Sequence, residues 1–134
     1  MTNIPRIDAV LEVALYVEDL QASTAFYQRV FGFDLIASDE RLQALGVAGR
    51  QVLLICTRKA SANLALGAHD AYGRQHLAFA VPASDLESWE TRLQQQAVTV
   101  EERRHWARGG LSVYFRDPDG HLLELATPGV WSIY

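Results

Sequence analysis

The chain has 134 residues, of which 49% are hydrophobic and 21% charged, and its formal net charge is −4 at pH 7. This length suits one compact domain, and the acidic balance argues against a nucleic-acid or membrane-surface partner, so a small-molecule partner is expected. The single cysteine, Cys56, cannot form an internal disulfide. Because the start has no leader-like pattern and no apolar run reaches about 18 residues, we expect a cytoplasmic protein.

The first half of the chain predicts a strand, a helix and three further strands. Residues 11–17 alternate between two faces, one of which carries Glu12 and Tyr16. Asp19 is a typical helix cap, and the helical spacing of apolar residues that follows it ends at Gly32. Three short β-prone runs come next, at residues 33–38, 42–48 and 51–56.

The second half repeats this order after a connector at residues 58–75, which has no clear period. The strand that follows the connector alternates like the opening strand, with His76 at the position of Glu12. Ser84 and Glu87 form a capping-box pattern for the next helix. The strands of this half are expected at residues 76–81, 98–106, 111–116 and 121–126.

The two halves are an internal repeat with a spacing of about 64 residues. We predict an α+β fold in which two βαβββ modules form curled mixed sheets around a shared cleft. The single domain comprises a first module at about 8–57, the connector at 58–75, a second module at 76–128 and a tail at 129–134. The first strands of both modules then place Glu12 and His76 on the cleft.

Glu124 lies among leucines in the last expected strand. A carboxylate buried there without a partner is costly, so it needs a cation, a hydrogen-bond donor or a metal ion. One imidazole and two carboxylates, from His76, Glu12 and Glu124, suit a divalent ion. Pairing of Glu124 with an arginine and a core-edge role for His76 are the alternatives. The turn DPDG at residues 117–120 is interpreted as structural.

The segments EVALYVEDLQASTAFYQRVFGF, HLAFAV and SVYFRDPDGHLLELATPG resemble the vicinal oxygen chelate superfamily of glyoxalases, bleomycin resistance proteins and dioxygenases. The resemblance implies a metal held on the inner faces of strands, here by Glu12, His76 and Glu124. The fourth ligand of glyoxalase I is missing, since its place falls at Leu53 or Leu54. A glutamate at position 12, where extradiol dioxygenases need a histidine, counts against that activity.

The resemblance implies a divalent-metal-dependent lyase, isomerase or transferase, which chelates a small oxygenated substrate and stabilises charge as a Lewis acid. Glu12 and Glu124 would then be catalytic groups as well as ligands of Zn²⁺, Ni²⁺, Mn²⁺, Fe²⁺ or Mg²⁺. A metal-free binding protein that sequesters an antibiotic, as in the bleomycin resistance branch, is the alternative. The site lies within one chain or is shared between the chains of a homodimer.

Five residues are candidates for binding the substrate: Tyr16, Tyr114, Arg116, Trp106 and Arg108. The two tyrosines and Arg116 are expected on cleft faces of strands, where an aromatic ring can stack on a ligand or donate a hydrogen bond to it. Trp106 and Arg108 lie in a loop that ends in two glycines. His121 is expected at the rim, off the face of Glu124.

Overall fold

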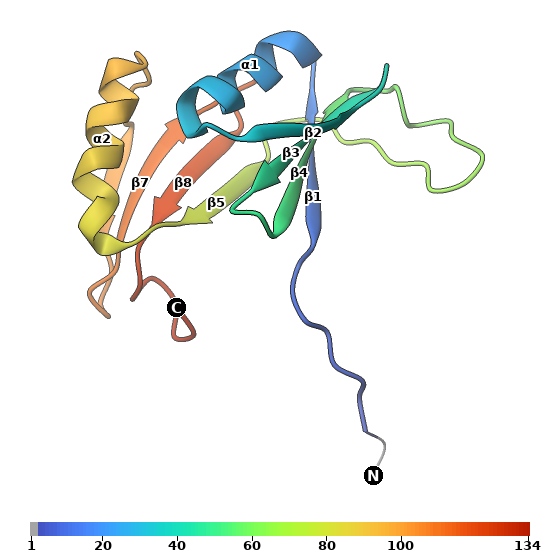
Figure 1. The fold of residues 1–134 in the computed structure, drawn as a ribbon. Helices are drawn as coiled ribbons and strands as arrows, with labels where there is room; N and C mark the ends of the chain where they lie inside the picture. Colours follow the sequence, from blue (N-terminus) through green and yellow to red (C-terminus); the bar gives the residue numbers. More distant parts are fainter. Residues whose placement is uncertain (1–2) are drawn as a thin grey trace.

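The computed structural model describes residues 3–134 (Figure 1). The first module consists of β1 (Glu12–Val17), α1 (Leu20–Phe31), β2 (Asp34–Ser38), β3 (Leu42–Val47) and β4 (Gln51–Thr57). The second module consists of β5 (His76–Ala80), a 3-10 turn (Ala83–Asp85), α2 (Leu86–Gln95), β6 (Glu102–His105), β7 (Leu111–Arg116) and β8 (Leu122–Ala126). No helix in residues 3–134 is long and apolar enough to cross a membrane.

Each module builds one four-stranded mixed sheet. The strand order is β1-β4-β3-β2 in the first sheet and β5-β8-β7-β6 in the second, with the first and last strand of each module running parallel. The predicted α+β fold of two βαβββ modules is therefore confirmed, and the two sheets remain separate.

The helix ends follow two different local patterns. Asp19 caps α1 as predicted, because its carboxylate accepts a hydrogen bond from the amide of Ala22 at 3.0 Å. The predicted capping box of Ser84 and Glu87 is wrong, since Ser84 lies in the 3-10 turn and Asp85 precedes α2 without a side-chain cap. The turn provides a different partner at this end, as the amide of Asp85 donates to the carbonyl of Pro82.

The predicted strand at residues 98–106 is shortened to β6. Val98 and Val100 pack against the core, and the amide of Val98 donates to the carbonyl of Leu93 at the end of α2. These residues therefore fix the connection between α2 and β6 to the core. Strand pairing with β7 is limited to Glu102–His105.

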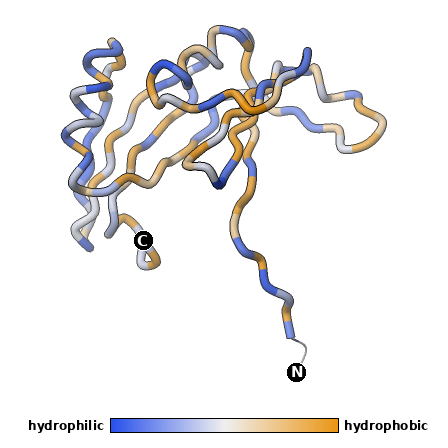
Figure 2. Tube along the Cα trace, in the orientation of Figure 1, coloured by the Kyte–Doolittle hydropathy of each residue, from blue (hydrophilic) through white to orange (hydrophobic). Residues whose placement is uncertain are grey.

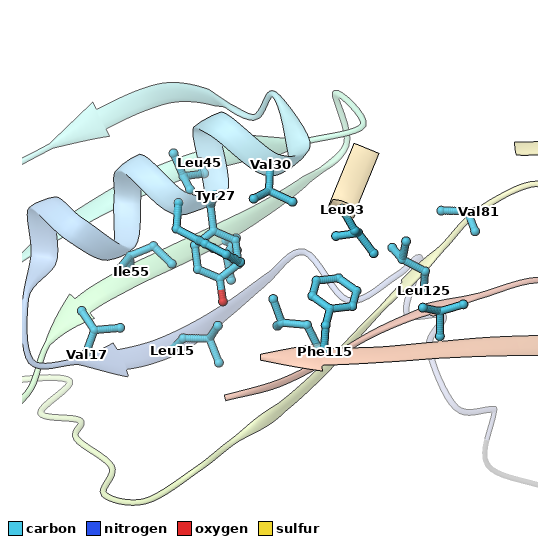
Figure 3. Packing of buried hydrophobic residues seen from close by; sticks show 14 of the residues in the cluster. Leu15, Val17, Tyr27, Val30, Leu45, Ile55, Val81, Leu93, Phe115 and Leu125 are labelled. Carbon is cyan, nitrogen blue, oxygen red and sulfur yellow. The ribbon is translucent and has the colours of Figure 1, made fainter. Parts of the chain in front are cut away.

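One hydrophobic core serves both modules (Figure 3). Phe31 at the end of α1 packs with aromatic rings from both halves of the chain: Phe33, Phe79, Trp89 and Phe115. In the close view, side chains of α1 and the first sheet meet those of α2 and the second sheet: Tyr27, Val30, Leu45, Ile55, Leu93, Phe115 and Leu125. Because the core occupies one face of each sheet, the opposite faces are left for a site.

A polar joint holds the ends of the modules together. His121 is 1% exposed, and its Nε2 donates to the carbonyl of Tyr16 while its Nδ1 accepts from the amide of Gln75, both at 2.9 Å. These two bonds fix one neutral tautomer, since a carbonyl oxygen can only accept. The prediction that His121 lies at the rim is wrong, because the turn before it directs the ring inward against β1.

The DPDG turn completes this joint. Asp119 accepts hydrogen bonds from the amide of Glu18 at 2.9 Å and the hydroxyl of Ser23 at 3.0 Å, which lie at the start of α1. Asp117 accepts from the hydroxyl of Tyr27 at 2.7 Å. The turn therefore has the structural role that the sequence predicted, and it also connects the two modules.

The outer edges of the two sheets differ in character. The edge strand β6 has the sequence ERRH and is exposed throughout. The edge strand β2 has the sequence DLIAS and exposes Leu35 and Ile36, with exposed fractions of 44% and 58%.

Candidate metal centre

His76 and Glu124 lie on neighbouring parallel strands, β5 and β8. Leu123 and Leu125 are fully buried in the core, so the alternation of β8 turns Glu124 to the opposite face, where Ala78 is its partner in register. Nε2 of His76 lies 3.3 Å from Oε1 of Glu124. The two side chains are therefore neighbours, and their role as metal ligands stays a prediction.

The imidazole of His76 is oriented by its own backbone ladder. Its Nδ1 lies 2.9 Å from the carbonyl oxygen of Leu122, to which it must donate. This bond holds the proton on Nδ1, so the lone pair of the neutral ring is on Nε2, directed at Glu124. A histidine that ligates a metal through one nitrogen typically donates from the other in this way.

The carboxylate of Glu124 is held from its other side. It is 6% exposed, and its Oε2 accepts from the hydroxyl of Ser112 at 2.5 Å. Ser112 accepts in turn from the indole Nε1–H of Trp106 at 2.8 Å. Trp106 therefore holds Ser112, and Ser112 holds the carboxylate.

A lone pair on His76 and an anionic oxygen of Glu124 therefore face each other at 3.3 Å. Two acceptors repel at this distance unless a proton or a metal cation lies between them. One imidazole nitrogen and one carboxylate oxygen are suitable ligands for Zn²⁺ and other divalent transition ions. The residues at this position thus fit a divalent metal.

Tyr114 and Arg104 surround the pair. The ring of Tyr114 stacks near His76 with 6.5 Å between centroids, and burial together with the Glu124 carboxylate raises the pKa of Tyr114, so its hydroxyl stays protonated at neutral pH. The guanidinium of Arg104 lies 5.4 Å from the ring centroid of Tyr114 and 5.2 Å from that of Trp106. Its side chain is 47% exposed, and its Nε and Nη2 donate to Glu102 at 3.2 and 2.8 Å, so an anion would share the guanidinium with that carboxylate.

Arg104 was not among the residues that the sequence singled out. It pairs in register with Ser112, which places it on the face of Glu124. This signal depends on the strand register between β6 and β7, which could not be read from a run of four consecutive polar residues.

Glu12 does not join the pair within this chain. It is exposed at the start of β1, in the other sheet, and residues 3–134 contain no group of three or more His, Cys, Asp or Glu side chains that could hold a metal ion. Glu12 instead lines a cavity of about 400 Å³ between β1, β4 and β5, together with Ala78 and Ala80. The alternative of a three-ligand site within one chain is therefore not formed by the described residues.

The other predicted substrate-binding residues have different surroundings. The hydroxyl of Tyr16 lies 2.5 Å from Nδ1 of His69, and burial, Cys56 and Asp70 raise the pKa of Tyr16. The guanidinium of Arg116 donates to Glu101 and to the carbonyl of Gly120, and Arg108 is exposed in the loop before β7. Of the five candidates, the structure places Tyr114 beside His76 and connects Trp106 to Glu124 through Ser112.

The first module shows which residue lies at the position of the missing fourth ligand. Leu53 is buried in the core, whereas Leu54 is the register partner of Ala14 and so shares the face of Glu12. Of the two positions considered, Leu54 is therefore the one that lies where a carboxylate could face the site.

The chain is similar in sequence to two metallothiol transferases. Metallothiol transferase FosB of Bacillus licheniformis is 32% identical over 116 residues, which cover 86% of this chain and 72% of that protein. Metallothiol transferase FosB of Lysinibacillus sphaericus is 28% identical over 122 residues, which cover 90% of this chain and 83% of that protein.

Solved structures show the same fold. Lactoylglutathione lyase from Agrobacterium tumefaciens superposes with a TM-score of 0.89 at 32% identity, covering 96% of this chain and 99% of that chain. The fosfomycin resistance protein FosX from Listeria monocytogenes superposes with a TM-score of 0.71 at 25% identity, covering 93% of this chain and 97% of that chain.

Two of these relatives are named as metallothiol transferases and one as a lyase, which confirms the predicted class of enzyme while leaving the reaction open. The family model described as Glyoxalase/Bleomycin resistance protein/Dioxygenase superfamily matches residues 7–125. With most of its length matched and its fold shared, the chain belongs to the glyoxalase, bleomycin resistance protein and dioxygenase superfamily, the vicinal oxygen chelate proteins.

Proposed function

We propose that the protein is a divalent-metal-dependent transferase that acts on a small, oxygenated, anionic substrate. The observation that carries the proposal is the 3.3 Å approach of Nε2 of His76 to Oε1 of Glu124. The remaining polar atom of each group is already engaged, by Leu122 and Ser112 respectively. A proton or a metal cation between the two groups would satisfy both, and the proposal is that a metal cation does so.

A homodimer with a shared site is part of the proposal. Glu12 of a second copy would supply the third ligand, since Glu12 is exposed and lies outside the pair of its own chain. The segment before β1 supports association, because it projects away from the packed elements with Ile4, Ile7, Val10 and Leu11 exposed (Figure 2). Exposed apolar side chains in such number are typical of an interface.

The chemistry would be divided between the metal and the chain. A metal such as Zn²⁺, Ni²⁺, Mn²⁺, Fe²⁺ or Mg²⁺ would act as a Lewis acid toward substrate oxygens. His76 and Glu124 would hold it, and Tyr114 would donate a hydrogen bond to a substrate oxygen. Arg104 would bind an anionic group of the substrate through its exposed guanidinium.

The residue at one position, Leu54, favours a transferase over a lyase. Leu54 stands on the face where a fourth carboxylate ligand would be needed for the glyoxalase I reaction, so that ligand set is incomplete. The relatives FosB and FosX are named as a transferase and a fosfomycin resistance protein, and a substrate of that kind, small and rich in oxygen, suits a centre flanked by Arg104 and Tyr114. The cytoplasmic location stays a prediction.

Metal binding tests the proposal directly. Protein purified without chelator should contain a divalent metal in near-stoichiometric amount by mass spectrometry, or should take up Mn²⁺, Ni²⁺ or Zn²⁺ in a calorimetric titration. His76→Ala and Glu124→Ala should each lose this binding, whereas the exposed His105→Ala on β6 should retain it. Wild-type protein that binds none of these ions would refute the proposal and favour the metal-free sequestering protein, whose ligand affinity Glu124→Ala would leave intact.

A further inference from the structure

We propose that Ser112 and Trp106 are positioning residues that hold the Glu124 carboxylate with Oε1 directed at His76, where a metal would bind. The inference rests on the proposed function, since it concerns how the same centre is held. It assigns a role to two side chains that are not themselves proposed metal ligands.

The direction of the hydrogen bonds follows from the chemistry of the three groups. The indole Nε1–H of Trp106 can only donate, so at 2.8 Å the hydroxyl oxygen of Ser112 must accept from it. The hydroxyl proton of Ser112 is then free to point at Oε2 of Glu124, 2.5 Å away. Ser112 is 1% exposed, so water does not compete for either bond.

This chain of donors leaves the two carboxylate oxygens of Glu124 unequal. Oε2 is occupied by Ser112, and Oε1 faces the lone pair of His76 at 3.3 Å. A metal held by His76 would therefore be reached first through Oε1, while Oε2 keeps its hydrogen bond to Ser112.

The backbone around Trp106 fixes the first donor. The amide of Trp106 donates to the carbonyl of Gly110, and the amide of Gly109 donates to the carbonyl of Trp106, both at 2.9 Å. A Cβ atom at Gly110 would lie 2.2 Å from the amide nitrogen of Val130. The loop is thus closed on itself and packed against the C-terminal tail, which limits the movement of the indole.

Metal affinity is the main test. Ser112→Ala should weaken the binding of Ni²⁺ or Zn²⁺ by about 10–100-fold in a calorimetric titration, the loss typical when a group that orients a ligand is removed. Ser112→Thr, which keeps the hydroxyl, should restore most of the affinity. Trp106→Phe should weaken binding in the wild-type background and have no further effect in the Ser112→Ala background, since the indole acts through the serine.

A second measurement does not depend on the metal. The indole N–H resonance of Trp106, assigned by its loss in Trp106→Phe, should shift upfield in metal-free Ser112→Ala, while the resonances of Trp89 and Trp131 stay in place. Circular dichroism should show that each variant is folded.

The outcomes separate the two claims. Wild-type protein without metal affinity overturns the proposed function and this inference with it. A wild type that binds metal together with a Ser112→Ala variant of equal affinity overturns the positioning role alone. Fully additive losses in the double variant, or an unchanged Trp106 resonance, contradict the chain of donors from Trp106 to Ser112.

Discussion

Tyr27 and Asp117 form an enclosed polar contact across the two modules. The phenol of Tyr27 is fully buried and donates to Asp117 at 2.7 Å. Burial raises the pKa of Asp117, and burial together with the Asp117 carboxylate raises the pKa of Tyr27. A buried polar group without its partner costs about 1–3 kcal/mol, so this pair makes separation of the modules unfavourable.

Cys56 is expected to be unreactive in the folded protein. Its side chain is buried on β4, and burial raises the pKa of the thiol to about 11. Because the thiolate is the nucleophile, folded protein at pH 8 should resist iodoacetamide, and unfolding in urea should permit complete labelling within the same period. Mass spectrometry of the labelled chain measures both. Rapid stoichiometric labelling of the folded protein would contradict the assignment.

The same thiol gives stability a defined pH dependence. Its pKa is higher in the folded state than the value of 9.0 that applies without burial, so the unfolded chain ionises first as the pH rises. The contribution of the Cys56 thiol to the free energy of unfolding is therefore complete below pH 9 and is lost between pH 9 and about 11. In urea unfolding across that interval, Cys56→Ala should show a shallower decline in the free energy of unfolding than the wild type.

The two helices offer a matched pair of caps. Asp19 caps α1 by accepting a hydrogen bond from the amide of Ala22, whereas Asp85 precedes α2 without such a bond. Asp19→Ala should therefore lower the free energy of unfolding by about 1 kcal/mol. Asp85→Ala should lower the free energy of unfolding by roughly a few tenths of a kcal/mol, because a negative charge near the helix N-terminus is lost. Urea denaturation compares them, and equal losses would show that the cap bond is not the source of the difference.

The sequence could predict what depends on local period. Alternation in β5 and β8 placed His76 and Glu124 on faces turned away from the core, and the structure brings them within contact. It could not predict His121, because the direction in which the DPDG turn sends the chain depends on contacts with Glu18 and Ser23, about a hundred residues earlier.

Glu12 marks the other limit of prediction from sequence. The repeat assigns it to the same kind of position as His76, and β1 keeps it exposed at that position. Equivalent positions in the two modules do not bring two side chains together. The two separate sheets pack on the shared core through the faces opposite to those that carry these side chains. Whether a third ligand reaches the pair is then a property of the assembly rather than of one chain.

A mixing experiment addresses the assembly. If the site is shared, a dimer of Glu12→Ala and Glu124→Ala chains contains one centre that lacks both groups and one that has all three ligands. Mixing the two inactive variants after mild dissociation should therefore restore tight metal binding to about one centre in each mixed dimer.

The control for this experiment is the double variant Glu12→Ala/Glu124→Ala mixed with either single variant, which provides no complete centre. Sedimentation equilibrium of the wild type should show a dimer at micromolar concentration. Recovery that is absent in mixtures proven to contain mixed dimers would contradict the shared site.

The unequal edges of the two sheets determine where folded chains would associate wrongly. An open strand edge is a template for another strand, and charged side chains are the usual protection. The ERRH edge of β6 has that protection, while β2 presents Leu35 and Ile36 beside unpaired backbone. Of these two outer edges, strand addition should therefore occur at β2 of the first module rather than at β6 of the second.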